Sequence, residues 1–207
     1  MNKAILVARN RGDISDEEAR RRCLSWPDLE GMTACTVHLA RAEGPPDVVA
    51  VASLALDEAR LPDQASLPQG LRIDAWLVDQ RLQWDYERDW PDGTVSPGLK
   101  RMSFVQRRPG LTREQFADHW TNRHAPLAKK HHPGVWRYAQ NVVIRPLTSG
   151  AADLDGVAEL SFRTDDDMRH RTYDSAEGRE VIAADVKRFI DLPAGWRVLA
   201  DEHVLKS

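Results

Sequence analysis

The chain has 207 residues, of which 42% are hydrophobic and 29% are charged, and its formal net charge is -3 at pH 7. This charge gives no electrostatic basis for binding nucleic acid or an anionic membrane, so neither is expected as a partner. The early apolar run AILVA is too short for a signal-peptide core, and no later run approaches the ~18 apolar residues of a membrane span. Cys23 and Cys35 make no disulfide framework, so both are expected as reduced thiols in a cytoplasmic protein.

The first predicted elements are a strand over 5–8 and a capped helix after it. Ser15 and Glu18 have the spacing of a capping box, in which the hydroxyl and the acid each accept a backbone N–H at the helix start. The same pattern returns later in the chain, with a strand over 102–105 and a capping pair of Thr112 and Gln115. The two segments, 4–23 and 101–120, align without gaps. The chain is therefore predicted to contain a tandem repeat.

The remaining elements of the two halves are also similar. Strands are predicted over 32–40, 47–56 and 72–84 in the first half, and over 135–144, 155–162 and 195–205 in the second. A helical segment over 166–190 precedes the last strand, whereas the corresponding DEARLPDQASLPQG (57–70) contains prolines and indicates a short or broken helix. The predicted order is βαββαβ, twice.

A βαββαβ unit forms a four-stranded antiparallel sheet with helices on one face, and its other face needs cover. We therefore expect an α+β fold: two ferredoxin-like βαββαβ units packed sheet-to-sheet as an intrachain dimeric α+β barrel, with a cavity between the sheets. The alternative is the same two units packed without a cavity. The predicted boundaries are 1–88 for a degenerate first unit, 89–98 for a linker and 99–207 for the second unit.

The second half resembles EthD-type domains. Residues 101–128, RMSFVQRRPGLTREQFADHWTNRHAPLA, contain the strand, the Pro-Gly turn, the helix start and the W-x-x-x-HAPL pattern of that family. WRYAQN (136–141), DGVAELSF (155–162) and ADVKRFID (184–191) resemble its later elements, so the resemblance covers roughly 99–205. The first half lacks the His-Ala-Pro-Leu pattern, and Pro27 aligns with His124. One complete site is therefore expected.

The resemblance implies the dimeric α+β barrel superfamily. That superfamily includes polyketide cyclases, cofactor-free monooxygenases, dehydratases, isomerases and haem-degrading enzymes. Some EthD-type domains resemble fungal polyketide dehydratases and others accompany degradation pathways, so both secondary metabolism and catabolism are implied. The fold alone does not select among these functions.

His124 is the first candidate catalytic residue. Phe116, Trp120, His124 and Leu127 recur with helical spacing and share one face. Because Pro126 disfavours helical geometry in the residue before it, the helix is expected to end near His124. A histidine there, beside an aromatic wall, suits a general acid or base. The alternative is a core histidine bonded to a backbone carbonyl.

Two carboxylates are candidate partners for His124. Asp185 lies on an apolar helical stripe, where a carboxylate needs a partner. It either bonds His124 and fixes its tautomer, or braces a backbone group or an arginine. Glu159 is expected to line the cavity, where its raised pKa would let it hold a proton. The alternative for Glu159 is a buried ion pair with Arg101 or Arg137.

The candidate substrate contacts lie on predicted strands and on the first helix of the second half. Tyr138 and Asn141 are expected to bond a substrate oxygen. The other candidates are Trp120, Phe104, Trp136 and His203.

No metal or cofactor is expected. His119 and His124 are i, i+5 and fall on different faces of an α-helix, whereas helical zinc pairs favour i, i+4. The KKHH run (129–132) is interpreted as a solvated corner. The sequence has no CxxC, HExxH or nucleotide-binding glycine motif, and no GxSxG.

These observations favour a cofactor-independent lyase, dehydratase or cyclase that moves a proton on a small apolar metabolite, aromatic or polyketide-like. The alternatives are a cofactor-free monooxygenase, a haem-handling enzyme of the same superfamily, and a non-catalytic small-molecule binding protein. Assembly into a homodimer is compatible with all of them.

Overall fold

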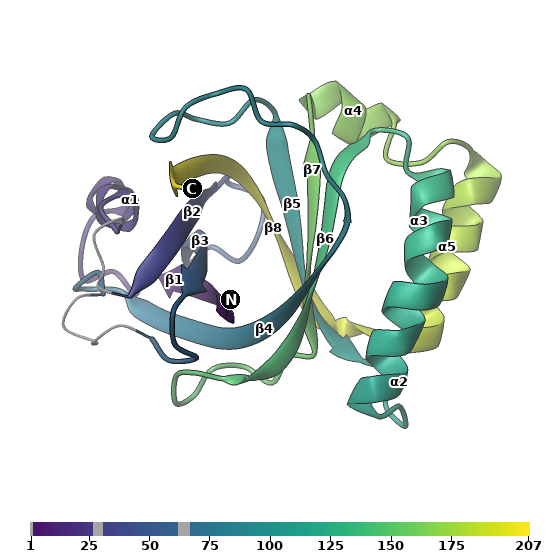
Figure 1. Cartoon of the computed structure of the whole chain (residues 1–207), viewed down its shortest axis with the longest axis horizontal. Helices are drawn as coiled ribbons and strands as arrows, with labels where there is room; N and C mark the ends of the chain where they lie inside the picture. The colour runs from purple at the N-terminus through teal and green to yellow at the C-terminus, as the bar shows by residue number, and fades with distance from the viewer. Residues whose placement is uncertain (1, 27–30, 62–66) are drawn as a thin grey trace.

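The computed structural model describes residues 2–26, 31–61 and 67–207 (Figure 1). The elements of the first half are β1 (Asn2–Arg9), α1 (Asp16–Leu24), β2 (Met32–Ala40), β3 (Val48–Leu56) and β4 (Arg72–Trp84). Those of the second half are β5 (Leu99–Arg107), α2 (Arg113–Asp118), η2 (His119–His124), α3 (Ala125–His131), β6 (Val135–Pro146), β7 (Gly156–Phe162), α4 (Asp165–His170), α5 (Ala176–Phe189) and β8 (Ile190–Lys206).

The described strands form one closed barrel in the order β1-β3-β2-β8-β5-β7-β6-β4. Every neighbouring pair is antiparallel. The pairs β2–β8 and β4–β6 join the two halves of the chain by backbone hydrogen bonds. Closure therefore gives each strand a partner along both edges and leaves no strand edge exposed to pair with another chain.

The predicted fold class was wrong. The sheets do not pack face to face as two ferredoxin-like units, because their edges join and the eight described strands enclose a single interior. The described parts of 57–71 contain only turns and bends, so they supply no second helix to the first half. Each half contributes four adjacent strands in the same relative order, β4-β1-β3-β2 and β8-β5-β7-β6. The description of the two halves as a tandem pseudo-dimer stays a prediction. The boundaries at 1–88, 89–98 and 99–207 stay predictions as well.

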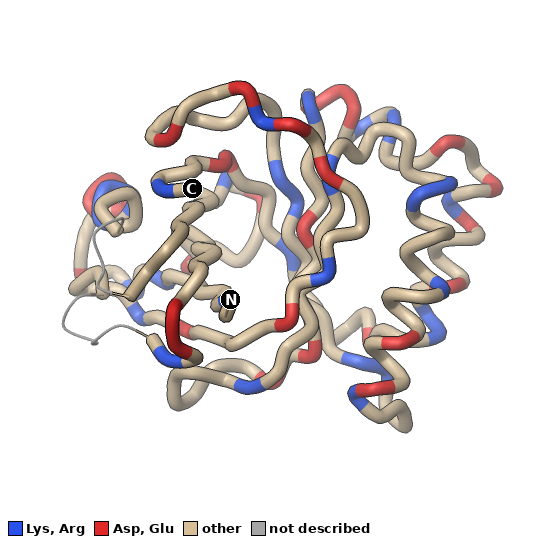
Figure 2. Tube along the Cα trace, in the orientation of Figure 1, with Lys and Arg blue, Asp and Glu red and all other residues tan. Residues whose placement is uncertain are grey.

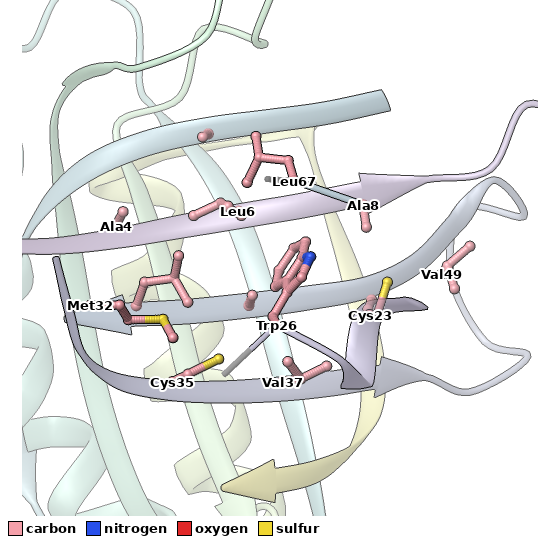
Figure 3. Close-up of a cluster of buried hydrophobic side chains, with 14 of the residues drawn as sticks. Ala4, Leu6, Ala8, Cys23, Trp26, Met32, Cys35, Val37, Val49 and Leu67 are labelled. Atoms are coloured by element: carbon pink, nitrogen blue, oxygen red, sulfur yellow. The ribbon is translucent and has the colours of Figure 1, made fainter. Parts of the chain in front are cut away.

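The helices lie outside the barrel, on two opposite sides (Figure 1). On the first-half side, α1 begins at the predicted cap, where the Ser15 hydroxyl accepts the Glu18 N–H at 3.2 Å. Its Cys23 packs with Trp26 against the outward side chains of β1, β2 and β3, including Leu6 and Val37 (Figure 3). Burial of this outer face is the main force that holds α1 to the barrel.

On the second-half side, α2, η2, α3 and α5 cover the outer face of β5, β7 and β6 (Figure 1). The predicted capping box at Thr112 is confirmed: its hydroxyl accepts the Gln115 N–H, and the Gln115 side chain accepts the Thr112 N–H. Phe116 and Trp120 point from this helix onto the barrel wall and are fully buried.

The expected helix end near His124 was wrong. A turn of π-helix, η2, carries the chain from α2 into α3, and the Ala125 N–H bonds the Trp120 carbonyl five residues back. Pro126 lies in the first turn of α3, where its missing N–H costs little. The π turn thus lets the helix continue past a proline, and such turns are frequent at functional sites.

The predicted helix over 166–190 is divided into α4 and α5. Between them, backbone groups bond the end of α3 instead of continuing a helix: the Asp174 N–H donates to the His131 carbonyl at 3.1 Å. Ser175 then caps α5 by accepting the Gly178 N–H.

In the described residues no helix is long and apolar enough to cross a membrane.

Gly156, at the start of β7, lets the Trp120 indole lie against the strand. A Cβ at this position would stand 2.3 Å from Trp120 Cζ3 and 2.8 Å from its Cη2. We expect Gly156→Ala to lower the free energy of unfolding by about 1–3 kcal/mol, the usual cost of overpacking a core. Chemical denaturation measures this value.

The double variant Gly156→Ala/Trp120→Phe provides the control, because both clashing atoms belong to the six-membered ring that phenylalanine lacks at that depth. The double variant should lose less stability than the sum of the two single variants. Additive losses would show that the indole does not cause the constraint.

Candidate functional site

A cleft of about 300 Å³ lies between the second-half helices and the outer face of the barrel. Its wall combines apolar and aromatic side chains with a few polar groups, which is the usual composition of small-molecule sites. Its lining includes Arg101, Trp120, His124, His132, Tyr138, Leu160, Val186 and Lys187. Of the predicted site residues, His124, Trp120, Tyr138 and Phe104 border this cleft.

His124 and Asp185 are hydrogen-bonded, as the first of the two hypotheses for Asp185 required. The distance from His124 Nδ1 to Asp185 Oδ2 is 2.9 Å, and both side chains are buried. The other carboxylate oxygen, Oδ1, lies 2.9 Å from His119 Nε2. Burial raises the pKa of Asp185, but the hydrogen bonds from His124 and His119 outweigh it, and the pKa lies below its usual value. The carboxylate is therefore ionised at neutral pH.

His119 was missed because the sequence interpretation assumed α-helical geometry. Five residues separate it from His124, which puts the two on different faces of an α-helix but on the same side of a π turn. Phe189 of α5 packs against both rings, with centroids 4.7 Å from His119 and 5.2 Å from His124.

In the described residues, no group of three or more His, Cys, Asp or Glu side chains could hold a metal ion.

Tyr138 borders the cleft, and its hydroxyl proton is available for a hydrogen bond. Its oxygen accepts the Trp120 indole N–H at 2.8 Å and the Gln140 amide at 3.1 Å. Its own O–H donates to no acceptor among the described residues. Burial raises the pKa of Tyr138 to about 12, although the bonds from Gln140 and Trp120 lower it. The phenol therefore keeps its proton and can donate it in a hydrogen bond to a ligand oxygen.

Two further cleft residues were not predicted as substrate contacts. Arg101 has no carboxylate partner among the described residues; its guanidinium lies 5.4 Å from the Phe162 ring, and burial lowers its pKa. The His132 Nδ1 bonds the Thr172 carbonyl, and burial lowers the pKa of His132 to about 4.

The interpretation of KKHH as a solvated corner was wrong for its histidines. His131 and His132 are buried, and His131 pairs with Asp174. Only the two lysines are exposed.

Glu159 and Asn141 lie inside the barrel, on the other side of its wall from His124. Period-2 alternation turns Glu159 inward while Leu160 faces the cleft. The Asn141 amide donates to Glu159 at 2.8 Å, and Arg137 pairs with Glu159 at 3.4 Å, as the ion-pair alternative required.

The expected raised pKa of Glu159 was wrong. Burial does raise it, but the charges of Lys3, Lys100 and Arg137 outweigh burial and hold the pKa of Glu159 well below its usual value. Glu159 is therefore ionised at neutral pH and has no proton to give.

The three remaining candidates contribute little to the cleft. Phe104 points into the barrel, stacked on Trp196 with centroids 3.7 Å apart, and only borders the cleft. Trp136 stacks on Tyr86 at 3.9 Å, outside the cleft. His203 lies on β8 opposite Val95 of the predicted linker. It lines neither this cleft nor the cavity inside the barrel.

The interior charges make the barrel sensitive to acid. Burial raises the pKa of Glu202, but Lys100 and other neighbours lower it to about 2, against an ordinary 4.5. Its stabilising contribution is thus complete above pH 4.5 and is lost as the pH falls toward 2. We expect Glu202→Gln to lose stability less steeply than the parent chain over this range. Denaturation at several pH values measures the slope, with exposed Glu87→Gln as the control. Equal slopes in Glu202→Gln and the parent would contradict the assignment.

Residues 108–193, which carry His124, Tyr138 and Asp185, match the EthD domain model. None of the curated proteins matches the sequence. An anthrone oxidase-like protein of known structure is 11% identical, with a TM-score of 0.61, over 100% of this chain and 94% of its own. A putative monooxygenase from Fusobacterium nucleatum subsp. nucleatum is 10% identical, with a TM-score of 0.55, over 99% of this chain and 92% of its own. At such identities these two likenesses show the fold alone. The domain match agrees with the resemblance of the second half of the chain to EthD-type domains.

Proposed function

We propose that the chain is an enzyme that removes a proton from a small aromatic or polyketide-like compound bound in the cleft. The reaction would then proceed by elimination or ring closure, as in a lyase, dehydratase or cyclase. The observation that carries the proposal is the buried His124–Asp185 hydrogen bond on the wall of an apolar cleft, with the Tyr138 hydroxyl bordering the same cleft.

In this proposal His124 is the base. With ionised Asp185 accepting from Nδ1–H, His124 Nε2 carries the lone pair, has no hydrogen-bond partner among the described residues and can accept a proton. Asp185 then stabilises the imidazolium that forms, as an orienting carboxylate does in other catalytic triads. His119 holds the second carboxylate oxygen, so Asp185 cannot rotate away from His124 without losing a bond.

Tyr138 and Arg101 would stabilise the charge left on the substrate. Removal of a C–H or O–H proton leaves an enolate or phenolate oxygen, which needs positioned donors. The Tyr138 O–H and the Arg101 guanidinium both border the cleft and have no acceptor or carboxylate of their own among the described residues. Trp120, Leu160 and Val186 give the apolar surface that an aromatic ring would contact.

A second candidate is cofactor-free oxygenation. It is supported by the structural likeness to an anthrone oxidase-like protein and a putative monooxygenase. The proton abstraction would be the same, but the resulting carbanion would react with molecular oxygen instead of expelling a leaving group. The third possibility, a carrier that binds such a compound without turnover, uses the cleft without the base.

Anthrone is a suitable probe because it has an acidic methylene. Exchange at this methylene reports proton removal separately from any later reaction of the carbanion. We expect the chain to accelerate hydrogen–deuterium exchange at this methylene under nitrogen, measured by NMR. His124→Ala should slow the exchange by about 10²–10⁴-fold, the usual contribution of a general base. Tyr138→Phe should slow it by about 10²-fold, as for loss of one oxyanion donor. His203→Ala, which lies outside the cleft, is the control.

Oxygen uptake with the same compound distinguishes the candidates. Uptake that depends on His124 favours oxygenation, and exchange without uptake favours the lyase or cyclase. Tight anthrone binding without either reaction would favour the carrier, and full exchange activity in His124→Ala would remove the proposed base.

Asp185 is proposed to act through His124, so its variants should alter the pH profile. In Asp185→Asn the imidazolium loses its counter-charge, and we expect the acid limb of the kcat/KM profile to move to lower pH while kcat falls. His119→Gln should change the profile less, because the His124–Asp185 bond remains. A loss of activity in Asp185→Asn with an unmoved acid limb and a lower unfolding temperature would mean that Asp185 is structural.

A further inference from the structure

A second cavity lies inside the barrel, separate from the cleft. It has a volume of about 190 Å³ and is bordered by side chains of seven strands and of the segment after β4. Its polar lining residues include Lys3, Thr36, His38, Ser53, Lys100 and Glu202. The proposed proton transfer uses none of these residues. The cavity and the cleft have no lining residue in common.

The buried charges of this cavity do not cancel. Lys3, Lys100 and Arg137 are positive, Glu159 and Glu202 are negative, and each of these side chains is at most 18% exposed. At the mouth, the more exposed Asp85 pairs with Arg137 at 3.0 Å, and Arg88 pairs with Asp92, which does not line the cavity. The excess of one positive charge therefore belongs to the buried part of the described lining, where a solvent-exposed carboxylate compensates it only weakly. The interior of the cavity is thus suited to an anion.

Lys3 is the cation with the weakest compensation. Among the described residues its ammonium bonds only Glu159, at 3.2 Å, and that carboxylate is shared with Lys100 and Arg137. Lys100 has Glu202 as a second partner, and Arg137 has Asp85 at 3.0 Å. Burial, opposed by Glu159, lowers the pKa of Lys3, and an anion beside it would raise that pKa again.

His38 supplies an unused donor in the same cavity. Its side chain is fully buried, and its Nδ1 has no hydrogen-bond partner in the part of the chain that the structure describes. The nearest carboxylate oxygen, Glu202 Oε2, is 3.7 Å away, beyond hydrogen-bond range. Burial lowers the pKa of His38 to about 3, so the ring is neutral. In the tautomer in which Nε2 accepts from the Ser53 hydroxyl at 3.5 Å, Nδ1 carries the ring proton and is a donor without a partner among the described residues.

We propose that the barrel interior is a binding site for a small organic carboxylate with one negative charge, held by Lys3 and by the N–H of His38. The buried excess of one positive charge matches a monoanion and not a phosphate dianion. At about 30 Å³ for each water-sized group, the cavity admits roughly six non-hydrogen atoms. Thr36 and Ser53 offer hydroxyls for the second carboxylate oxygen or for a hydroxyl on the ligand.

Butanoate, which has six non-hydrogen atoms, is the probe, and neutral butanamide of the same size and shape is its control. In calorimetric titrations of the full chain at constant ionic strength, butanoate should bind and butanamide should bind at least about tenfold more weakly. Lys3→Met should weaken butanoate binding by about tenfold or more. Lys187→Met, which removes a lysine from the cleft, should leave it unchanged, so the two cavities are distinguished.

A second measurement does not depend on a stable Lys3 variant. The ¹⁵N resonance of His38 Nδ1 should shift when butanoate is added to the parent chain and stay in place with butanamide. The proposal is overturned if butanoate gives no heat and no shift, if butanamide binds equally well, or if Lys187→Met loses butanoate binding while Lys3→Met keeps it. None of these results bears on the base in the cleft.

Discussion

Closure of the barrel is the constraint from which both cavities follow. Once every strand has two neighbours, the wall is a single continuous layer, and alternate residues of each strand must face either its interior or its outside. Consecutive residues of β5, Lys100 and Arg101, therefore serve different cavities, and so do Glu159 and Leu160 of β7. No side chain of the wall can serve both without a change of register.

The two compartments differ in how they stabilise charge. Inside the barrel, ionised groups compensate one another directly, and the carboxylates keep depressed pKa values despite their burial. In the cleft, Arg101, Lys187 and Arg197 lie among apolar and aromatic side chains with no carboxylate in the described lining, and Asp185 contacts the cleft only through its bond to His124. Charged residues of both signs occur within the barrel strands as well as on the helices and loops (Figure 2). What separates the compartments chemically is thus the pairing of charges, not their presence.

The strand positions and the starts of α1 and α2 could be predicted from the sequence because alternation and capping are local signals. The pairing of His124 with Asp185 could be proposed because a carboxylate on an apolar stripe requires a partner. The place of His119 could not, because the π turn that aligns it depends on how Pro126 is accommodated in the folded chain. The joining of strand edges is likewise non-local, and no pattern within one strand records which strand lies beside it.

The interior cluster has only a weak signal in the sequence. Lys3 and His38 interrupt largely apolar strands, whereas Lys100 and Glu202 lie beside other charged residues, Arg101 and Asp201. A charged residue within an apolar strand predicts a partner on another strand, but not which one. The four cluster residues come from β1, β2, β5 and β8, which are distant in sequence, so only the strand order brings them together.

The single-layer wall also determines which mutations the central strands tolerate. Most substitutions in β7 affect one compartment, because each side chain has one side to occupy. Loss or gain of a single residue within the strand would instead exchange the sides, turning Glu159 toward Trp120 and Leu160 toward the buried lysine. The strands shared by both cavities are therefore expected to vary in composition but not in length among related chains, and insertions should be confined to the turns that connect them.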